Sequence, residues 1–445
     1  MKQVYTLLLV IFGLGVRAQS KGDFHNWAVT PPMGWNSWDC FGPTVTEAEV
    51  KANADYMAKH LKAYGWEYVV VDIRWYVSND KAHGYNETNA EYNIDEYGRF
   101  IPAVNRFPSA AGGKGFKPLA DYLHSKGLKF GIHIMRGVPV VAVKRGLPVK
   151  GTKVTAKDIY STQDQCKWLR DMYTIVPDKE GAQEYYNSLF DMYASWGVDF
   201  VKVDDLSAPV YHAEEIEMIR KAIDRTGRKI LLSTSPGETP VARGAHVQQH
   251  ANMWRTVDDF WDAWEPLHAH FEVFERWNKW RTAGAWPDGD MLPLGRIGIR
   301  AERGNPRMTK FTKDEQYTLM TLWCIFRSPL MFGGNLPDND PFTLSLLTNR
   351  NVLAVLKNSS NNKPLLNDEE KAIWTADAPG AGRRYVAVFN KGTDKAAITV
   401  DLTQIRATGS CKVTDLWTGK VLGKFSGSFS PEINPHGAGL YKISY

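Results

Sequence analysis

The sequence is poor in cysteine, and the spacing of its cysteines excludes two kinds of site. Its 445 residues include only four, namely Cys40, Cys166, Cys324 and Cys411. They are far apart and lack the close pairs that bind zinc or build a dense disulfide framework. We therefore expect buried free thiols.

Blocks of like charge are also absent. The 54 lysines and arginines are interspersed with 49 aspartates and glutamates, and the formal net charge is only +5. A nucleic-acid-binding surface would need clustered basic residues, so we expect no nucleic-acid partner. The hydrophobic share of 43% is enough to bury a large core, in one large domain and a smaller one.

The apolar run near the N-terminus, from Val4 to Val16, is too short to span a bilayer. It follows Lys2 and precedes a small-residue site that ends at Ala18, as in a cleavable secretory signal. We therefore expect residues 1–18 to be a signal peptide and the protein to be periplasmic or extracellular, without membrane insertion.

Residues 29 to about 350 alternate short apolar runs with helical patterns, which predicts strand–helix units around a parallel sheet. Capping boxes at Thr46/Glu49 and Thr312/Glu315 mark two of the helix starts. The eight predicted strands are residues 29–38, 67–73, 129–135, 199–205, 229–236, 253–259, 286–292 and 329–335. Eight strands in alternation predict an α/β fold, a (β/α)8 TIM barrel over residues 19–355.

The last part of the chain has a different pattern. After about residue 360 the helical period disappears, and stretches such as "YVAVFN" and "AAITVDL" alternate apolar with polar residues between turns. Residues 356–445 therefore predict a C-terminal antiparallel β-sandwich domain.

Polar side chains end nearly every predicted barrel strand. Any one of them has a structural explanation, because aspartates at strand ends often cap helices and tryptophans often cover the rim of a barrel. Taken together they indicate an active site, because active sites of such barrels lie at the C-terminal ends of the strands. The set is Trp38, Asp72, His133, Lys202, Asp204, Ser235, Arg255, Asp259, Asp288 and Asp290.

Two of these acids have a basic neighbour on their own side of the chain. In "FVKVDDLSAP" side chains alternate, so Lys202 and Asp204 share one face, whereas Asp205 points to the other. The alternative is a helix N-cap at Asp205 or Ser207. The second pair is Arg255 and Asp259. Glycoside hydrolases use two carboxylates that face each other across a pocket, one as nucleophile and one as proton donor, and aromatic surfaces that hold the sugar.

The residues also carry a family resemblance. The segments "TPPMGWNSW", Lys-x-Asp at 202–204, "WRTVDDFWDAW" and "DGDML" resemble glycoside hydrolase family 27, the α-galactosidase (melibiase) family. The resemblance implies a retaining exo-glycosidase with no metal or cofactor, in which Asp204 is the nucleophile and Asp259 the acid/base. It also implies that Trp38, Asp72, Lys202 and Arg255 bind the sugar.

Four positions depart from the family's usual pattern. Ile73 replaces an aspartate that helps bind the 6-hydroxymethyl group of galactose, which favours a pentopyranose such as β-L-arabinopyranose. His133 replaces a tyrosine, Val203 an aromatic residue, and Ser235 a partner of the sugar 2-hydroxyl. A small residue at position 235 resembles the N-acetylgalactosaminidase branch.

The sequence leaves several functions open. The first is an α-galactosidase, followed by a β-L-arabinopyranosidase and then an α-N-acetylgalactosaminidase. A non-catalytic carbohydrate-binding barrel is a further alternative. The presence of both carboxylates with their basic partners argues against it, because sugar binding alone does not require them. An Asp-based metallohydrolase would need more histidines at one site. The carbohydrate's linkage and aglycone, and the oligomeric state, stay open.

Overall fold

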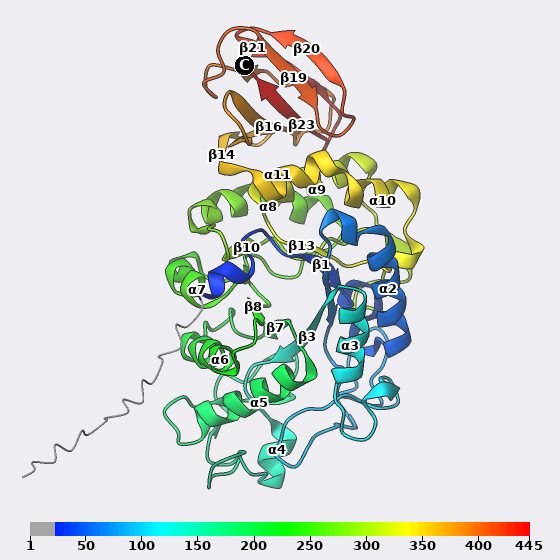
Figure 1. The fold of residues 1–445 in the computed structure, drawn as a ribbon, viewed down its shortest axis with the longest axis vertical. Coiled ribbons are helices and arrows are strands. Elements are labelled where there is room, and N and C mark those ends of the chain that lie inside the picture. Colours follow the sequence, from blue (N-terminus) through cyan, green and yellow to red (C-terminus); the bar gives the residue numbers. More distant parts are fainter. Residues whose placement is uncertain (1–22) are drawn as a thin grey trace, which may run out of the picture.

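The computed structural model describes residues 23–445, so the predicted signal peptide at residues 1–18 lies outside the described residues. The chain folds into a barrel of strands and helices followed by a β-sandwich at one end (Figure 1). Among the described residues, no helix combines the length and the apolar character needed to cross a bilayer.

The barrel sheet has eight parallel strands in the order β10-β9-β8-β7-β3-β2-β1-β13. An isolated parallel bridge between Leu292 and Phe332 links the segment after β10 to β13, so the two edges of the curled sheet approach each other. Each of the eight predicted segments contains one strand. The strands are β1 (Met33–Asn36), β2 (Tyr68–Val71), β3 (Lys129–Met135), β7 (Phe200–Asp204), β8 (Leu231–Thr234), β9 (Met253–Arg255), β10 (Trp286–Asp288) and β13 (Leu330–Phe332).

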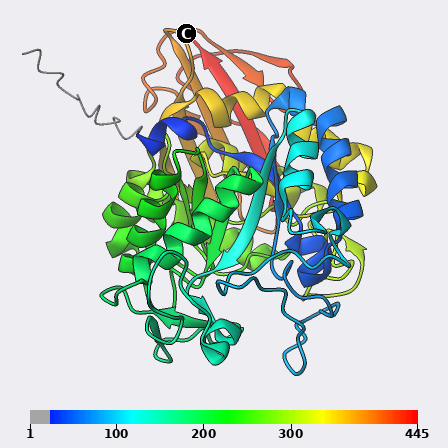
Figure 2. The ribbon, with the colours of Figure 1, turned by 60° about the horizontal axis from the view of Figure 1, so that its bottom comes forward.

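Helices surround these strands (Figure 2). Both predicted capping boxes are present, at the starts of α2 and α9. Gly65, Gly127, Gly197 and Gly227 have φ between 69° and 98°, the left-handed conformation expected where a helical segment ends. The helices are α1 (Trp38–Phe41), α2 (Glu47–His60), α3 (Lys117–Ser125), α5 (Ala182–Trp196), α6 (Ala213–Thr226), α7 (Gly244–His250), α8 (Trp264–Trp277), α9 (Lys313–Phe326), α10 (Pro341–Thr348) and α11 (Arg350–Asn358).

Two insertions extend the C-terminal side of the barrel. The one after β3 carries α4 (Val140–Arg145) and a small sheet of β4 (Val138–Pro139), β6 (Met172–Ile175) and β5 (Tyr160–Ser161). The one after β10 carries a hairpin of β11 (Arg296–Ile297) and β12 (Arg307–Met308). Neither insertion was predicted from the sequence.

The C-terminal domain is an antiparallel sandwich, as predicted. Its larger sheet has the order β14-β15-β16-β23-β19-β20, and two short pairs, β17-β22 and β18-β21, complete it. Helix α11 ends at Asn358, three residues beyond the predicted boundary, and α9 packs against β23. The strands are β14 (Ser360–Asn367), β15 (Lys371–Asp377), β16 (Arg383–Asn390), β17 (Ala396–Ala397), β18 (Val400–Asp401), β19 (Cys411–Asp415), β20 (Val421–Phe425), β21 (Ser428–Phe429), β22 (Glu432–Ile433) and β23 (Ala438–Ser444).

The cysteines are as expected. All four are buried and none is in a disulfide. Burial raises the pKa of the Cys324 thiol and of the Cys40 thiol, so neither is a reactive thiolate at neutral pH.

Candidate active site

A cavity of about 660 Å³ opens at the C-terminal ends of the barrel strands. This is the end at which such barrels carry their active sites. Nine residues were given a catalytic or sugar-binding position by the family resemblance, and seven of them line the cavity, namely Trp38, Asp72, Ile73, Lys202, Asp204, Arg255 and Asp259. The strand-end residue Asp290 lines it as well, whereas Asp288 lines a separate small void beneath it. The strand-end pattern therefore located one site made from residues that are far apart in the sequence.

Asp204 and Asp205 point in different directions, as strand alternation predicts. Asp204 lines the cavity, whereas Asp205 forms an ion pair with Arg136, with Oδ2 2.9 Å from a guanidinium nitrogen. The residue at the N-cap of α6 is His212, so neither Asp205 nor Ser207 caps that helix. The helix-cap alternative for this segment is wrong.

The environment of Asp204 stabilises its ionised form. The carboxylate has His133 Nε2 2.8 Å from Oδ2 and Lys202 Nζ 3.8 Å from Oδ1. Burial raises the pKa of Asp204, but His133, Lys202 and the more distant Arg255 outweigh burial and lower the pKa to about 2. Asp204 is therefore a carboxylate throughout the neutral range.

Asp72 is held in a fixed orientation on the cavity floor. Its Oδ2 accepts hydrogen bonds from Asn36 Nδ2 at 2.7 Å and from Lys202 Nζ at 3.1 Å. Its backbone N–H donates to Ser37 Oγ at 2.9 Å. An amide donor at the end of β1 and an ammonium donor on β7 thus align one carboxylate for a ligand in the cavity.

Ile73 places an apolar surface beside this carboxylate. The side chain lines the cavity although the residue is only 1% exposed, and its backbone N–H donates to Asp72 Oδ1 at 2.8 Å. A ligand group that lies against Ile73 therefore meets no hydrogen-bonding side-chain atom from this position.

On the opposite side, Arg255 joins two acids. Its guanidinium lies 3.1 Å from Asp259 Oδ1 and 2.8 Å from Asp290 Oδ1. The Asp259 side chain is 35% exposed, whereas that of Asp204 is 6% exposed. One carboxylate of the predicted pair is therefore accessible to solvent and the other is enclosed.

The two remaining predicted residues, His133 and Ser235, are set back from the cavity. His133 is completely buried behind Asp204. Ser235 accepts a hydrogen bond from Arg255 at 3.3 Å and lines a separate small void beneath it. Neither residue lines the cavity, and each contacts a residue that does, so direct contact of either with a sugar stays a prediction.

The structure adds Asp39 to the site. Asp39 follows Trp38 in α1, lines the cavity and leaves its buried Oδ2 without a hydrogen-bond partner. A Cβ atom at Gly333 would lie 2.0 Å from that oxygen, so only glycine leaves room for it. Burial, then the nearby Asp290 and Asp259, raise the pKa of Asp39 well above its usual range. Its place beside Trp38 was the available signal in the sequence.

Aromatic side chains form one wall of the cavity. Trp38 stacks on Tyr85 with ring centroids 6.0 Å apart, and Tyr85 lies 6.1 Å from Trp168. Flat aromatic faces of this kind suit the apolar faces of sugar rings. Tyr85 and Trp168 come from loops rather than strand ends, and sequence reasoning did not identify them.

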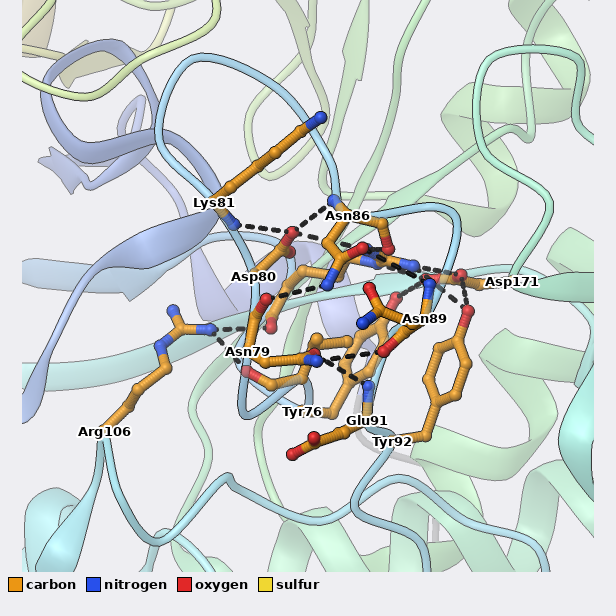
Figure 3. A network of polar contacts seen from close by, with 12 residues as sticks. Tyr76, Asn79, Asp80, Lys81, Asn86, Asn89, Glu91, Tyr92, Arg106 and Asp171 are labelled. Atoms are coloured by element: carbon orange, nitrogen blue, oxygen red, sulfur yellow. Dashed lines mark hydrogen bonds and ion pairs between the residues drawn. The ribbon is translucent and has the colours of Figure 1, made fainter.

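A buried polar network holds the loop that carries Tyr85 (Figure 3). Asp171, from the insertion after β3, accepts hydrogen bonds from Arg74 Nε at 2.7 Å, Tyr76 at 2.8 Å and Tyr92 at 2.5 Å. Asp80 accepts hydrogen bonds from the backbone N–H groups of Lys81 and Asn86 within the same loop. Two loops that line the cavity are thereby fixed to each other.

Comparison with known proteins agrees with this geometry. The profile of the family described as Alpha galactosidase A matches residues 30–173 and 170–358, and that of the Alpha galactosidase C-terminal beta sandwich domain matches residues 368–443. The chain is 29% identical to the α-galactosidase of Coffea arabica over 426 residues, covering 94% of each chain. It is 26% identical to α-galactosidase 2 of Arabidopsis thaliana, covering 99% of this chain and 96% of the relative.

Two solved structures are more similar. A β-L-arabinopyranosidase of family GH27 from Geobacillus stearothermophilus is 53% identical, with a TM-score of 0.93 and coverage of 95% of this chain and 98% of that one. A Bacillus halodurans protein of proposed α-N-acetylgalactosaminidase activity is 48% identical, with a TM-score of 0.85 and coverage of 93% and 97%. Since the matches span both domains, the protein belongs to glycoside hydrolase family 27, the α-galactosidase family, and is a glycoside hydrolase.

Proposed function

We propose that the protein is a retaining exo-glycosidase that releases terminal β-L-arabinopyranose. The observation that carries this proposal is Ile73, which lines the cavity with an apolar side chain. By the family resemblance, an aspartate at this position would bind the 6-hydroxymethyl group of galactose. L-Arabinopyranose has the hydroxyl arrangement of galactose without that group. The 53% identity to a β-L-arabinopyranosidase supports this choice.

The two reactive carboxylates have different tasks in the double displacement. Asp204, enclosed and ionised, attacks the anomeric carbon as the leaving oxygen departs, and a covalent glycosyl–enzyme ester forms. Asp259 donates a proton to the leaving oxygen and then takes one from the water that hydrolyses the ester. Its partial exposure supports this assignment, because the second water must reach it.

The remaining polar groups orient the sugar. Lys202 Nζ donates a hydrogen bond to Asp72 Oδ2 at 3.1 Å. The pair offers an acceptor and a donor to neighbouring hydroxyls of the sugar. Trp38 provides the flat surface on which the ring rests. These contacts restrict the cavity to one terminal sugar in a single orientation.

α-Galactosidase activity is the second candidate function. It is favoured by the α-galactosidases of plants to which the chain is similar along most of its length. The α-N-acetylgalactosaminidase alternative depends on a small residue at position 235, yet Ser235 is bonded to Arg255 outside the cavity. We therefore place that activity third.

The test is a comparison of three substrates with the purified mature chain: nitrophenyl β-L-arabinopyranoside, α-D-galactoside and α-N-acetyl-D-galactosaminide. We expect the arabinopyranoside to have the highest kcat/KM, by about one to two orders of magnitude over the galactoside. A higher value on either of the other two would reject the proposal.

Export from the cytoplasm is part of the same proposal, because the N-terminal segment has the pattern of a signal peptide. N-terminal sequencing of protein secreted by an expressing host should begin at Gln19. An N-terminus at Met1 on exported protein, or retention of the whole chain in the cytoplasm, would contradict it.

A further inference from the structure

A second group of potential ligands lies outside the cavity, on the outer helices of the barrel. Glu217 of α6 and His246 and His250 of α7 each offer one ligand atom, and these atoms lie within 4.8 Å of one another. Among residues 23–445 this is the one such group of three histidine, cysteine or acidic side chains. None of the three lines the catalytic cavity.

We propose that Glu217, His246 and His250 form a structural binding site for a divalent transition-metal ion of the zinc class. His246 and His250 are four residues apart, so they lie on the same face of α7, one turn from each other. Two histidines and one carboxylate are a ligand set that zinc accepts, with water in a fourth position.

The spacing of the donor atoms fits one ion. The Nε2 atom of His246 lies 3.4 Å from Oε1 of Glu217. Two ligands at about 2.0 to 2.2 Å from a tetrahedral ion are separated by roughly 3.3 to 3.6 Å. All three ligand atoms lie within 4.8 Å of one another, so an ion would draw the ligand atom of His250 closer to the other two by rotation of its side chain.

The outer hydrogen bonds favour metal binding by the free ring nitrogens. Nδ1 of His250 lies 2.7 Å from the backbone oxygen of His246. A carbonyl oxygen only accepts hydrogen bonds, so this Nδ1 carries a proton. Nδ1 of His246 lies 2.7 Å from the hydroxyl of Tyr211. His250 therefore keeps the lone pair of its Nε2 for an ion. His246 keeps the lone pair of its Nε2 when its Nδ1–H donates to Tyr211, and an ion would then replace the contact between this Nε2 and Oε1 of Glu217.

Two basic side chains near the three ligands lower the affinity of the site for a cation but do not occupy it. Lys221 Nζ lies 4.0 Å from Oε2 of Glu217, the oxygen that does not face His246, and its side chain is 65% exposed. Arg243 lies 5.5 Å from the ring centre of Tyr211. Lys221 can turn into solvent when an ion binds.

The position of the cluster gives the ion a structural role. Helix α6 follows the loop after β7, and α7 follows the loop after β8. These two loops supply Ala208, Pro209, Pro236 and Gly237 to the cavity wall. An ion shared by α6 and α7 would tie the two segments together and raise the stability of the folded chain, since it binds the native state only.

The test uses the untagged full-length mature chain, because a polyhistidine tag would itself bind zinc. After removal of metals, zinc chloride is titrated by calorimetry and thermal unfolding is followed with and without zinc. We expect about one zinc ion per chain and a rise in Tm of a few degrees. The variants His250→Ala and Glu217→Gln should each lower zinc affinity at least about tenfold and reduce the rise in Tm.

Matched controls are Glu214→Gln on the exposed side of α6 and His268→Gln on α8, both outside the cluster. These variants should keep the affinity and the Tm rise of the natural chain. No zinc binding by the natural chain, or equal zinc binding by the cluster variants and the controls, would overturn the proposal. Since neither readout uses a glycoside, the result is independent of the proposed enzymatic function.

Discussion

His133 lies directly behind Asp204, with Nε2 2.8 Å from Oδ2. The imidazole is completely buried and does not line the cavity, whereas Asp204, which it contacts, does. It is also the largest of the interactions that lower the pKa of Asp204 against the effect of burial. His133 is therefore a positioning residue for the proposed nucleophile.

Replacing His133 with glutamine should raise the pKa of Asp204, because it removes the interaction that lowers that pKa most. We expect kcat/KM to fall about tenfold and the acid side of its pH profile to move to higher pH. The control is His270→Gln, a buried histidine of α8 bonded to backbone oxygens. Equal pH profiles for the two variants would contradict the role given to His133.

Asp204 and Asp205 are adjacent but should respond differently to substitution. Asp204→Asn should lose about three orders of magnitude or more in kcat while still binding the sugar, because the amide cannot form the covalent intermediate. Asp205→Asn weakens the ion pair with Arg136 and removes no side chain that lines the cavity, so it should lower Tm and leave most of the activity. The comparison is made by steady-state kinetics and thermal unfolding of both variants. Full activity in Asp204→Asn would rule out the assignment.

The sequence predicted the barrel and the strand-end residues because both depend on local patterns. Alternation along β7 alone distinguishes Asp204 from Asp205, and periodicity with capping residues marks the helices. The sandwich was predicted for the same reason, since its strands alternate between turns.

Loop residues of the site depend instead on contacts between distant segments. Tyr85 reaches the cavity because Arg74 pairs with Asp171, 97 residues away, and no local pattern reports such a contact. The burial of His133 and Ser235 behind other side chains likewise follows from packing between neighbouring strands. Sequence reasoning therefore found the strand ends and missed the loops.

Asp288 should make stability depend on pH in an unusual direction. Burial, together with Asp290, raises its pKa to about 7, although Arg255 opposes this. A carboxyl with a raised native pKa binds more protons in the native state than in the unfolded state, so its contribution to stability is lost as pH rises from about 4 to 7. Asp288→Asn removes that loss.

The measurement is the difference in Tm between Asp288→Asn and the natural chain at several pH values. We expect the difference to become more favourable to the variant by several degrees between pH 4 and pH 7.5. Asp258→Asn, an exposed neighbour of the site, is the control and should show a flat difference. A flat difference for Asp288→Asn would refute the assigned titration.

Chelation should separate activity from the helix cluster. The two carboxylates of the cavity supply both the nucleophile and the proton donor, so activity in EDTA should equal activity in buffer. Zinc-loaded protein treated with EDTA should lose only the rise in Tm that the ion supplies. Activity lost in EDTA and restored by a divalent ion would revive the metallohydrolase alternative.

The central claim is that Ile73 selects a sugar without a 6-hydroxymethyl group. A buried hydroxyl left without a partner costs about 1 to 3 kcal/mol, or roughly one to two orders of magnitude in relative kcat/KM. Ile73→Asp would supply the missing acceptor, provided that its carboxylate and that of Asp72 tolerate each other. Ile73→Leu is the matched control, because it keeps the apolar surface.

The most direct measurement is the ratio of kcat/KM on nitrophenyl α-D-galactoside to that on nitrophenyl β-L-arabinopyranoside, for the natural chain and both variants. We expect the ratio to be below one in the natural chain and in Ile73→Leu, and to rise at least about tenfold in Ile73→Asp. An unchanged ratio in a folded Ile73→Asp variant would show that Ile73 does not determine the sugar.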